Sequence, residues 1–419
     1  MGGLSAQTSD SRGRWIRIAV GITLIQAVLA LLTRTQPLLG VPLTAAAGMS
    51  PAAVGQLASA TSLGSMLYYL WGTAALGSLG AARQLRTGCL LAGVAILLSL
   101  SGSWAMMLVA ALLIGIGYGP SAPAGSDILI GIVPRHRRGL VFSVKQAGVP
   151  LGGLLAGLLL PAALLWGGVG AALSAAAGLA FAAALVLGYW FREPGPARRM
   201  NMRALLTPAM LARPVAMFRL VNSDVAMRTI TLAALGLAVA QGVLMSYFPV
   251  FLIAHAQISL TAAGALFALL QGFGIVGRIA AGWFSDRIGS PIATLTGAGL
   301  LSSITMVLVA CLGPDSPLAG FTLVAALAGI CVVSWNGVFL AGLAALAPET
   351  EVGNVTSAGT LVVFGGYVLS PLLLQGILAV TESYPVGFGV AALAPLLSAV
   401  YLLHTRRQQV RSPHRDDSS

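Results

Sequence analysis

Long apolar stretches recur along the chain from Ile16 to His404, and each is long enough to form a membrane-spanning helix. About 18 apolar residues in a helix cross the hydrocarbon core of a bilayer, which is about 30 Å thick. Hydrophobic residues make up 57% of the 419 positions and charged residues only 8%, too few for the surface of a soluble protein. The sequence therefore predicts an all-α membrane protein, because a β-barrel would show short alternating segments instead.

The apolar stretches predict twelve membrane spans separated by short loops. The spans are expected at about 15–39, 52–76, 86–103, 105–133, 139–164, 167–190, 227–254, 260–284, 291–313, 317–346, 355–379 and 385–404. A long hydrophilic stretch in the middle divides them into six and six. The predicted organisation is an N-terminal six-helix bundle (1–190), a cytoplasmic middle loop (191–226), a C-terminal six-helix bundle (227–404) and a cytoplasmic tail (405–419).

The two halves show a weak internal repeat. The loop PRHRRG (134–139) joins spans four and five, and the loop PETEVG (348–353) joins spans ten and eleven. Both loops run from proline to glycine over the same length, and each is followed by a glycine-rich span. A parallel duplication of six-span units is a known plan of secondary transporters, with the substrate site near the bilayer midplane.

Basic residues are distributed very unevenly over the loops. The chain has 23 Lys and Arg against 11 Asp and Glu, and all but Arg34 and Lys145 of the basic residues fall on one side of the predicted membrane. The loops of the other side carry only Asp315 and Glu382. The positive-inside rule places both termini and the middle loop in the cytoplasm, which also requires an even number of spans. The positive net charge thus reports topology in a lipid bilayer, and no nucleic-acid partner is expected.

The segment GRIAAGWFSDRIGSP (277–291) is the strongest local motif. Gly282, Asp286, Arg287 and Gly289 match G-x-x-x-D-R-x-G, the cytoplasmic loop motif of the major facilitator superfamily, which the chain resembles over its full length. The glycine allows a tight turn, and the aspartate can accept hydrogen bonds or pair with an arginine as a conformational latch. An ordinary charged loop is the alternative, since Ser290 and Pro291 replace the basic run usual in the family.

That resemblance implies several properties of the whole protein. It implies two pseudo-symmetric bundles of six helices, transport by alternating access and a monomeric state. It also implies a place in the bacterial inner membrane. The glycines of span five resemble an antiporter motif, but tight helix packing explains them equally well.

The clear intramembrane charges of the predicted spans are Arg34, Asp127 and Lys145, the last being the only lysine of the chain, whereas the other charged residues are assigned to loops or span ends. A charge at the bilayer centre costs on the order of 2.5–3.5 kcal/mol on insertion scales, so each should be paired or face a cavity. Asp127 and Lys145 lie at matched depths on consecutive antiparallel spans, which allows an ion pair and a role in proton coupling. Snorkelling of Lys145 to the cytoplasm and of Arg34 to lipid phosphate are the alternatives.

Candidate substrate contacts come from both halves. In the first half, Arg34 and Lys145 can bind an anion, and Gln146 can add hydrogen bonds. The candidates of the second half are neutral: Gln241, Tyr247, Gln271, Trp335 and Asn336. Each of these neutral groups could equally serve helix packing.

The sequence predicts transport that is not driven by ATP hydrolysis. The glycines of GIGYGPSAPAG (115–125) lack the Lys-Ser/Thr of a phosphate-binding loop, and no cofactor, metal site or enzymatic cluster is expected. The predicted function is secondary active transport of a small organic anion, a carboxylate, with proton coupling through Asp127 or by exchange. The alternative is a proton-driven efflux pump for hydrophobic drugs.

Overall fold

The computed structural model describes residues 3–72, 79–134, 137–191, 207–348 and 351–411. Within these ranges every secondary-structure element is a helix, so the predicted all-α class is confirmed. Most of the middle loop (192–206) and the end of the tail (412–419) lie outside the described residues. Contacts divide the chain into unit 1, Met1–Leu211 with Leu260–Ala268, and unit 2, Ala212–Ser259 with Leu269–Ser419.

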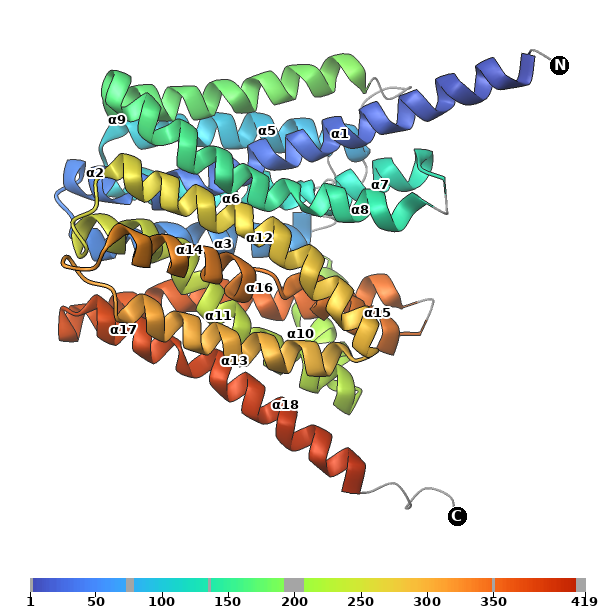
Figure 1. Cartoon of the computed structure of the whole chain (residues 1–419). Coiled ribbons are helices and arrows are strands. Elements are labelled where there is room, and N and C mark those ends of the chain that lie inside the picture. Colours follow the sequence, from blue (N-terminus) through green and yellow to red (C-terminus); the bar gives the residue numbers. More distant parts are fainter. Residues whose placement is uncertain (1–2, 73–78, 135–136, 192–206, 349–350, 412–419) are drawn as a thin grey trace. The chain divides into compact units, whose positions relative to one another are not determined.

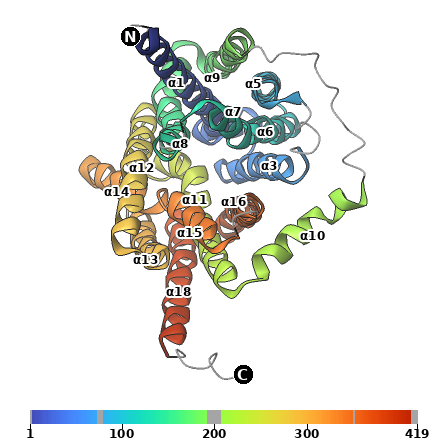
Figure 2. The same cartoon turned by 90° about the vertical axis from the view of Figure 1, so that its right-hand side faces the viewer.

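Unit 1 is built of helices that pack side by side (Figures 1 and 2). Helix α1 packs against α9, α3 against α6, and α5 against both α6 and α9. The elements are α1 (Gly3–Leu38), α2 (Gly40–Ala46), η1 (Pro51–Ala53), α3 (Val54–Leu67), η2 (Tyr68–Gly72), α5 (Ala81–Leu98), η4 (Ser99–Ser101), α6 (Trp104–Tyr118), η5 (Gly119–Ser121), α7 (Pro123–Ile132), α8 (Arg138–Gln146) and α9 (Gly148–Trp190).

Unit 2 is a second helical bundle in which α11 packs against α16 and α18, and α13 packs against α14 and α18. Its buried core includes Trp335, Phe339 and Leu343, which cluster with Ile230 and Leu237 of α11. The elements are α10 (Pro208–Asn222, whose first residues belong to unit 1), α11 (Val225–Ala254), α12 (Leu260–Ile288), α13 (Pro291–Ala310), α14 (Leu318–Val332), α15 (Asn336–Leu346), α16 (Val352–Thr381), α17 (Tyr384–Ala391) and α18 (Leu393–Arg411).

Ten helical segments of the described residues are long and apolar enough to cross a membrane. The difference from twelve predicted spans has two physical reasons. Helix α9 has 43 residues, about 65 Å of helix, and non-helical backbone at Gly167 and Gly168 turns it back on itself, so it contains spans five and six. Span two is divided between α3 and the π-helical η2, and residues 73–78 beyond it are outside the described residues.

Two predicted spans are interrupted near their middle. In span four, η5 separates α6 from α7, and Pro120 and Pro123 lack the N–H groups that a continuous helix would use. In span ten, residues 333–335 separate α14 from α15. The first interruption precedes the loop at Pro134 by as many positions as the second precedes the loop at Pro348. The internal repeat therefore extends to the helix breaks.

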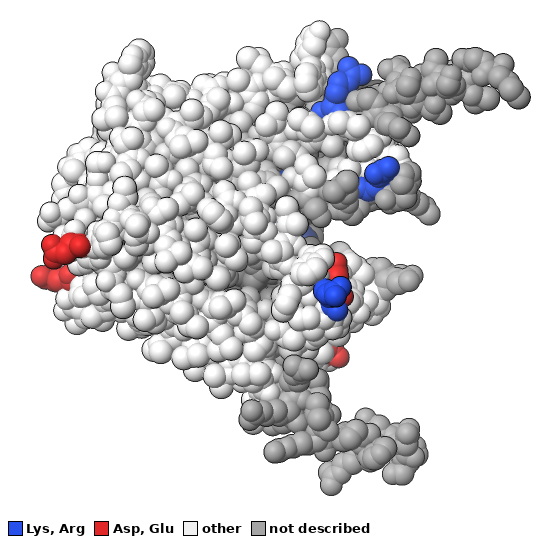
Figure 3. All heavy atoms as spheres, in the orientation of Figure 1, with Lys and Arg blue, Asp and Glu red and all other residues white. Residues whose placement is uncertain are grey.

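Within unit 2, the acidic residues Asp315 and Glu382 lie at the end of the helices opposite to Arg287, which has Asp286 beside it. Asp315 lies between α13 and α14 and Glu382 caps the end of α16, whereas Arg287 lies in the last turn of α12. On the face shown in Figure 3, the end with the isolated acidic atoms carries no basic side chain among the described residues. This arrangement agrees with the uneven charge pattern of the sequence.

Candidate functional site

Lys145 is the last residue but one of α8, next to the junction where α8 gives way to α9. Its side chain is only 1% exposed, among the largest fully buried side chains of the described residues. The ammonium Nζ donates to the backbone carbonyl of Ala122 at 2.5 Å and to the hydroxyl of Ser126 at 2.9 Å. Both partners are neutral, and both belong to the start of α7 just after the break in span four.

Asp127 follows Ser126 on α7, and its side chain is exposed. It is close enough to interact electrostatically with Lys145 and with Tyr68. The structure thus brings the two predicted charges onto neighbouring helices, while the ammonium donates its hydrogen bonds to Ala122 and Ser126. The lysine is bonded to span four and does not extend to an exposed surface.

A pair of amides completes the polar group at this junction. Gln26 of α1 is 1% exposed, and its Nε2 donates to Oε1 of the exposed Gln146 at 3.2 Å. Gln26 was not predicted as a site residue, although a glutamine in an otherwise apolar span is a signal that could have found it. Arg34 is half-buried and lies two turns further along α1, about 12 Å from Gln26.

The internal repeat offers a comparison for the lysine. Gly359 of α16 follows Pro348 by as many positions as Lys145 follows Pro134, and a Cβ at Gly359 would meet the apolar side chains of Leu343 and Phe339. At the second break, in span ten, Ser334 Oγ donates a hydrogen bond to the backbone carbonyl of Gly329 at 2.9 Å, so a neutral hydroxyl satisfies a carbonyl there. A helix break of this kind therefore does not require a cation.

Unit 2 contains a neutral hydrogen-bonded group on three helices. Gln241 of α11 accepts at Oε1 from Nδ2 of Asn336 and from the hydroxyl of Tyr367, both at 3.1 Å. The Tyr367 hydroxyl also lies 3.3 Å from Oδ1 of Asn336. Asn336 begins α15 after the break in span ten, and Tyr367 lies on α16. The structure brings together two predicted residues and adds Tyr367, which sequence reasoning missed.

The other predicted polar residues of the second half make separate contacts. The Tyr247 hydroxyl donates to the carbonyl of Pro371 at 3.1 Å, and Gln271 Nε2 lies 3.5 Å from the sulfur of Met245. Trp335 is 1% exposed and belongs to the apolar core, where its ring is tilted against that of Phe339 with centroids 5.9 Å apart. These three residues are not brought together with the group around Gln241.

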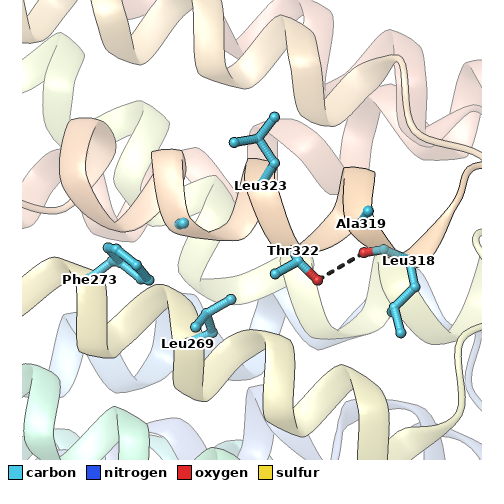
Figure 4. A pocket seen from close by; sticks show the side chains of 7 residues that line it. Leu269, Phe273, Leu318, Ala319, Thr322 and Leu323 are labelled. Carbon is cyan, nitrogen blue, oxygen red and sulfur yellow. Dashed lines mark hydrogen bonds between the residues drawn. The ribbon is translucent and has the colours of Figure 1, made fainter.

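An apolar groove lies between α12 and α14 of unit 2 (Figure 4). Its only hydroxyl is satisfied internally, since Thr322 donates to the carbonyl of Leu318 at 2.9 Å. The groove therefore suits an apolar molecule and offers nothing to an anion. The lining residues are Leu269, Phe273, Leu318, Ala319, Thr322, Leu323 and Ala326.

Comparison with known families decides the identity of this fold. The model of the Major Facilitator Superfamily matches residues 22–371, most of the chain. The chain belongs to the major facilitator superfamily. The resemblance of its sequence to this family is thus confirmed, and the all-helical bundles fit the facilitator fold.

Relatives and solved structures of the superfamily extend this assignment. The uncharacterized MFS-type transporters Rv2994 and MT3072 of Mycobacterium tuberculosis are each 28% identical over 309 residues, which cover 71% of this chain. The match spans 66% of their length, just under two thirds. Membership of a transporter family and the apolar helices make this a multi-pass membrane protein.

Two solved structures share the facilitator fold at low sequence identity. A bacterial homologue of the human lysosomal transporter Spinster, inward-facing and unoccupied, is 18% identical with a TM-score of 0.74, covering 95% of this chain and 99% of that chain. The peptide transporter POT in complex with sulfate is 15% identical with a TM-score of 0.75, covering 94% of this chain and 95% of that chain.

The facilitator loop motif lies at the end of α12. Asp286 and Arg287 are exposed, and the Arg287 guanidinium lies 5.9 Å from the ring centroid of Trp283. Gly289 has a φ of +66°, a left-handed conformation that explains the need for glycine at the turn. Gly282 is half-buried one turn before Asp286. The predicted latch through Asp286 stays a prediction.

Proposed function

We propose that this facilitator is a secondary active transporter that works by alternating access and moves a small organic anion, a carboxylate. The observation that supports this proposal is Lys145, a buried ammonium that donates hydrogen bonds to the neutral groups of Ala122 and Ser126. A charge in such a place is costly unless it is compensated, and Asp127 nearby is exposed. A bound carboxylate would add a negative charge to that of Asp127, which already interacts electrostatically with the ammonium.

The internal repeat supports a ligand role for the lysine over a structural one. The second helix break is held by neutral side chains, with glycine at the position that corresponds to Lys145. The Ala122 carbonyl would also keep two donors without the lysine, because the backbone N–H and the hydroxyl of Ser126 both reach it, at 3.1 and 2.8 Å. The charge is therefore dispensable for the fold and useful for an anion.

The remaining substrate contacts are assigned to polar groups of each unit. In unit 1, Arg34 and Gln146 join Lys145 as anion contacts. In unit 2, Gln241 and Asn336 offer hydrogen bonds to neutral parts of a substrate. Tyr247, Gln271 and Trp335 are kept as further candidates, although each has its own place in the packing of unit 2.

The proposal includes the cell membrane and the coupling ion. The protein is proposed to act as a monomer in a bacterial inner membrane, as the family resemblance implies, and the charge pattern favours cytoplasmic N- and C-termini. Substrate movement is coupled to protons through Asp127 or proceeds by exchange. The alternative function is proton-driven efflux of hydrophobic drugs, and the apolar groove of Figure 4 is the observation that favours it.

Ligand binding by the purified protein tests the proposal directly. Thermal unfolding in detergent is measured against small carboxylates, inorganic anions and neutral lipophilic compounds. A carboxylate at 100 times its Kd should stabilise the folded state by about 2.7 kcal/mol and raise the Tm. Stabilisation by lipophilic compounds alone would reject the carboxylate and favour efflux of hydrophobic drugs.

Substitution Asp127→Asn tests proton coupling. In proteoliposomes with an imposed pH gradient, the variant should bind the carboxylate but lose gradient-driven accumulation, because asparagine cannot take up and release a proton. Asp315→Asn, in the loop between α13 and α14, is the matched control and should accumulate substrate like the wild type. Gradient-driven accumulation that persists in Asp127→Asn would show that another group couples the proton.

A further inference from the structure

We propose that the site at Lys145 selects carboxylates that carry a hydroxyl or ammonium group next to the carboxylate. The Gln26 side-chain oxygen accepts a hydrogen bond from this neighbouring group. The inference rests on the proposed function and names its substrate class more narrowly. It comes from a juxtaposition at the α8–α9 junction. Two buried groups adjoin there: the Lys145 ammonium, which has one N–H donor left over, and the Gln26 amide, whose oxygen accepts no hydrogen bond from the described residues.

Gln26 supplies the bare acceptor. Its side chain is 1% exposed, its Nε2 is engaged by Gln146, and its Oε1 has no hydrogen-bond partner among the described residues. An amide oxygen accepts up to two hydrogen bonds, and a buried acceptor left without a donor costs about 1–3 kcal/mol. A ligand that brings a hydroxyl or ammonium donor would remove this cost.

Lys145 supplies the spare donor. An ammonium group has three N–H donors, and Ala122 and Ser126 account for two of them. The third is available to a carboxylate oxygen. A carboxylate here would also add to the electrostatic compensation that Asp127 gives the ammonium.

The packing of α1 places Gln26 beside the lysine. A Cβ built on Gly125 lies 2.9 Å from Lys145 Cε and 3.1 Å from Ile22 Cγ2, so the lysine stem and Ile22 adjoin. Gln26 is one helical turn beyond Ile22, on the same side of α1. A Cβ on Gly148, three residues after Lys145, would lie 3.3 Å from Gln26 Cβ. The amide and the ammonium therefore flank one junction.

Gln36 shows that an unpartnered amide oxygen alone is not a sign of a ligand. It is also 1% exposed with a bare Oε1, and its Nε2 donates to Ser99 at 3.2 Å and to the carbonyl of Met107 at 3.0 Å. Neither of these two hydrogen bonds of Gln36 involves a charged group. The proposal for Gln26 depends on the neighbouring cation, and Gln36 is its matched control.

Matched pairs of acids test the inference in the full-length protein. The Kd values of lactate and propionate, and of malate and succinate, are measured by calorimetry for the wild type and for Gln26→Leu, Gln26→Met and Gln36→Leu. We expect the wild type to bind the hydroxy acid about tenfold more tightly, as one hydrogen bond of about 1.4 kcal/mol allows. Both Gln26 variants should bind the two acids of a pair equally, and Gln36→Leu should keep the preference.

The outcomes separate this inference from the proposed function. Equal binding of hydroxylated and plain acids by the wild type, or a preference that survives in both Gln26 variants, overturns the role of Gln26 and leaves carboxylate transport standing. Failure of the wild type to bind any carboxylate rejects the proposed function and the inference with it. Because the wild-type comparison needs no variant, a Gln26 variant that does not fold cannot mask the result.

Discussion

Substitution Lys145→Met is expected to weaken carboxylate binding by about 30-fold, because a charge-assisted hydrogen bond of about 2 kcal/mol is lost. The same change should leave the Tm unchanged or raise it. Removing the ammonium relieves the cost of burying a charge, and the Ala122 carbonyl keeps the backbone N–H and hydroxyl of Ser126 as donors. Calorimetric Kd values and thermal unfolding of the same preparation measure both effects.

Ser126→Ala is the control for this experiment. It removes one hydrogen bond of the ammonium and keeps the charge that attracts the carboxylate, so the affinity should fall by clearly less than the about 30-fold expected for Lys145→Met. A Lys145→Met protein that melts far below the wild type and still binds carboxylates normally would make the lysine a structural residue. That result would contradict the anion site.

Substitution Gly115→Leu is expected to destabilise the protein by about 3 kcal/mol or more and to reduce the yield of folded protein sharply. A Cβ at Gly115 of α6 would meet the backbone of α3, at the carbonyl oxygen of Thr61 and 2.9 Å from the N atom of Ser65. Gly64 meets α6 reciprocally, and Ser65 Oγ donates to the Gly115 carbonyl at 3.1 Å. Backbone atoms on both sides cannot move aside as a flexible side chain would, and helix association in membranes depends on such close packing.

Gly178→Leu provides the comparison for Gly115. Gly178 lies within α9, is exposed and has nothing within 4 Å of the added Cβ. Leucine should there be neutral or slightly stabilising, because it is a better helix former than glycine. The midpoints of thermal unfolding of the two variants measure both effects on stability. Equal midpoints would show that the protein does not depend on the close approach of α3 and α6.

The spans and the family could be predicted from the sequence because their signals are long or local. Twenty apolar residues in a row leave little choice other than a membrane helix, and the motif around Asp286 and Arg287 is contiguous. The helix break in span four was harder to predict, although Pro120 and Pro123 mark it. Apolar length alone does not distinguish a continuous span from two half-helices.

The contacts of the candidate site could be predicted only in part. Counting residues from the loop between spans four and five gives the depth of Asp127 and Lys145 in the membrane. It does not give the direction in which each side chain points. The hydrogen bonds of the lysine to Ala122 and Ser126 depend on the break in span four, which apolar length does not reveal. Gln26 and Tyr367 were missed because a single polar residue in an apolar span gives no indication of its partner.

The turn within α9 has a mechanical consequence. Gly167 and Gly168 alone reverse the chain between spans five and six, and Gly168 adopts a φ of +71° with a ψ of −168°, a conformation essentially restricted to glycine. A connection this short has no slack, so the two arms cannot slide past each other by a full helical turn, about 5.4 Å. A displacement of the first arm along its axis, beginning beside Lys145, must therefore also displace the start of the second arm.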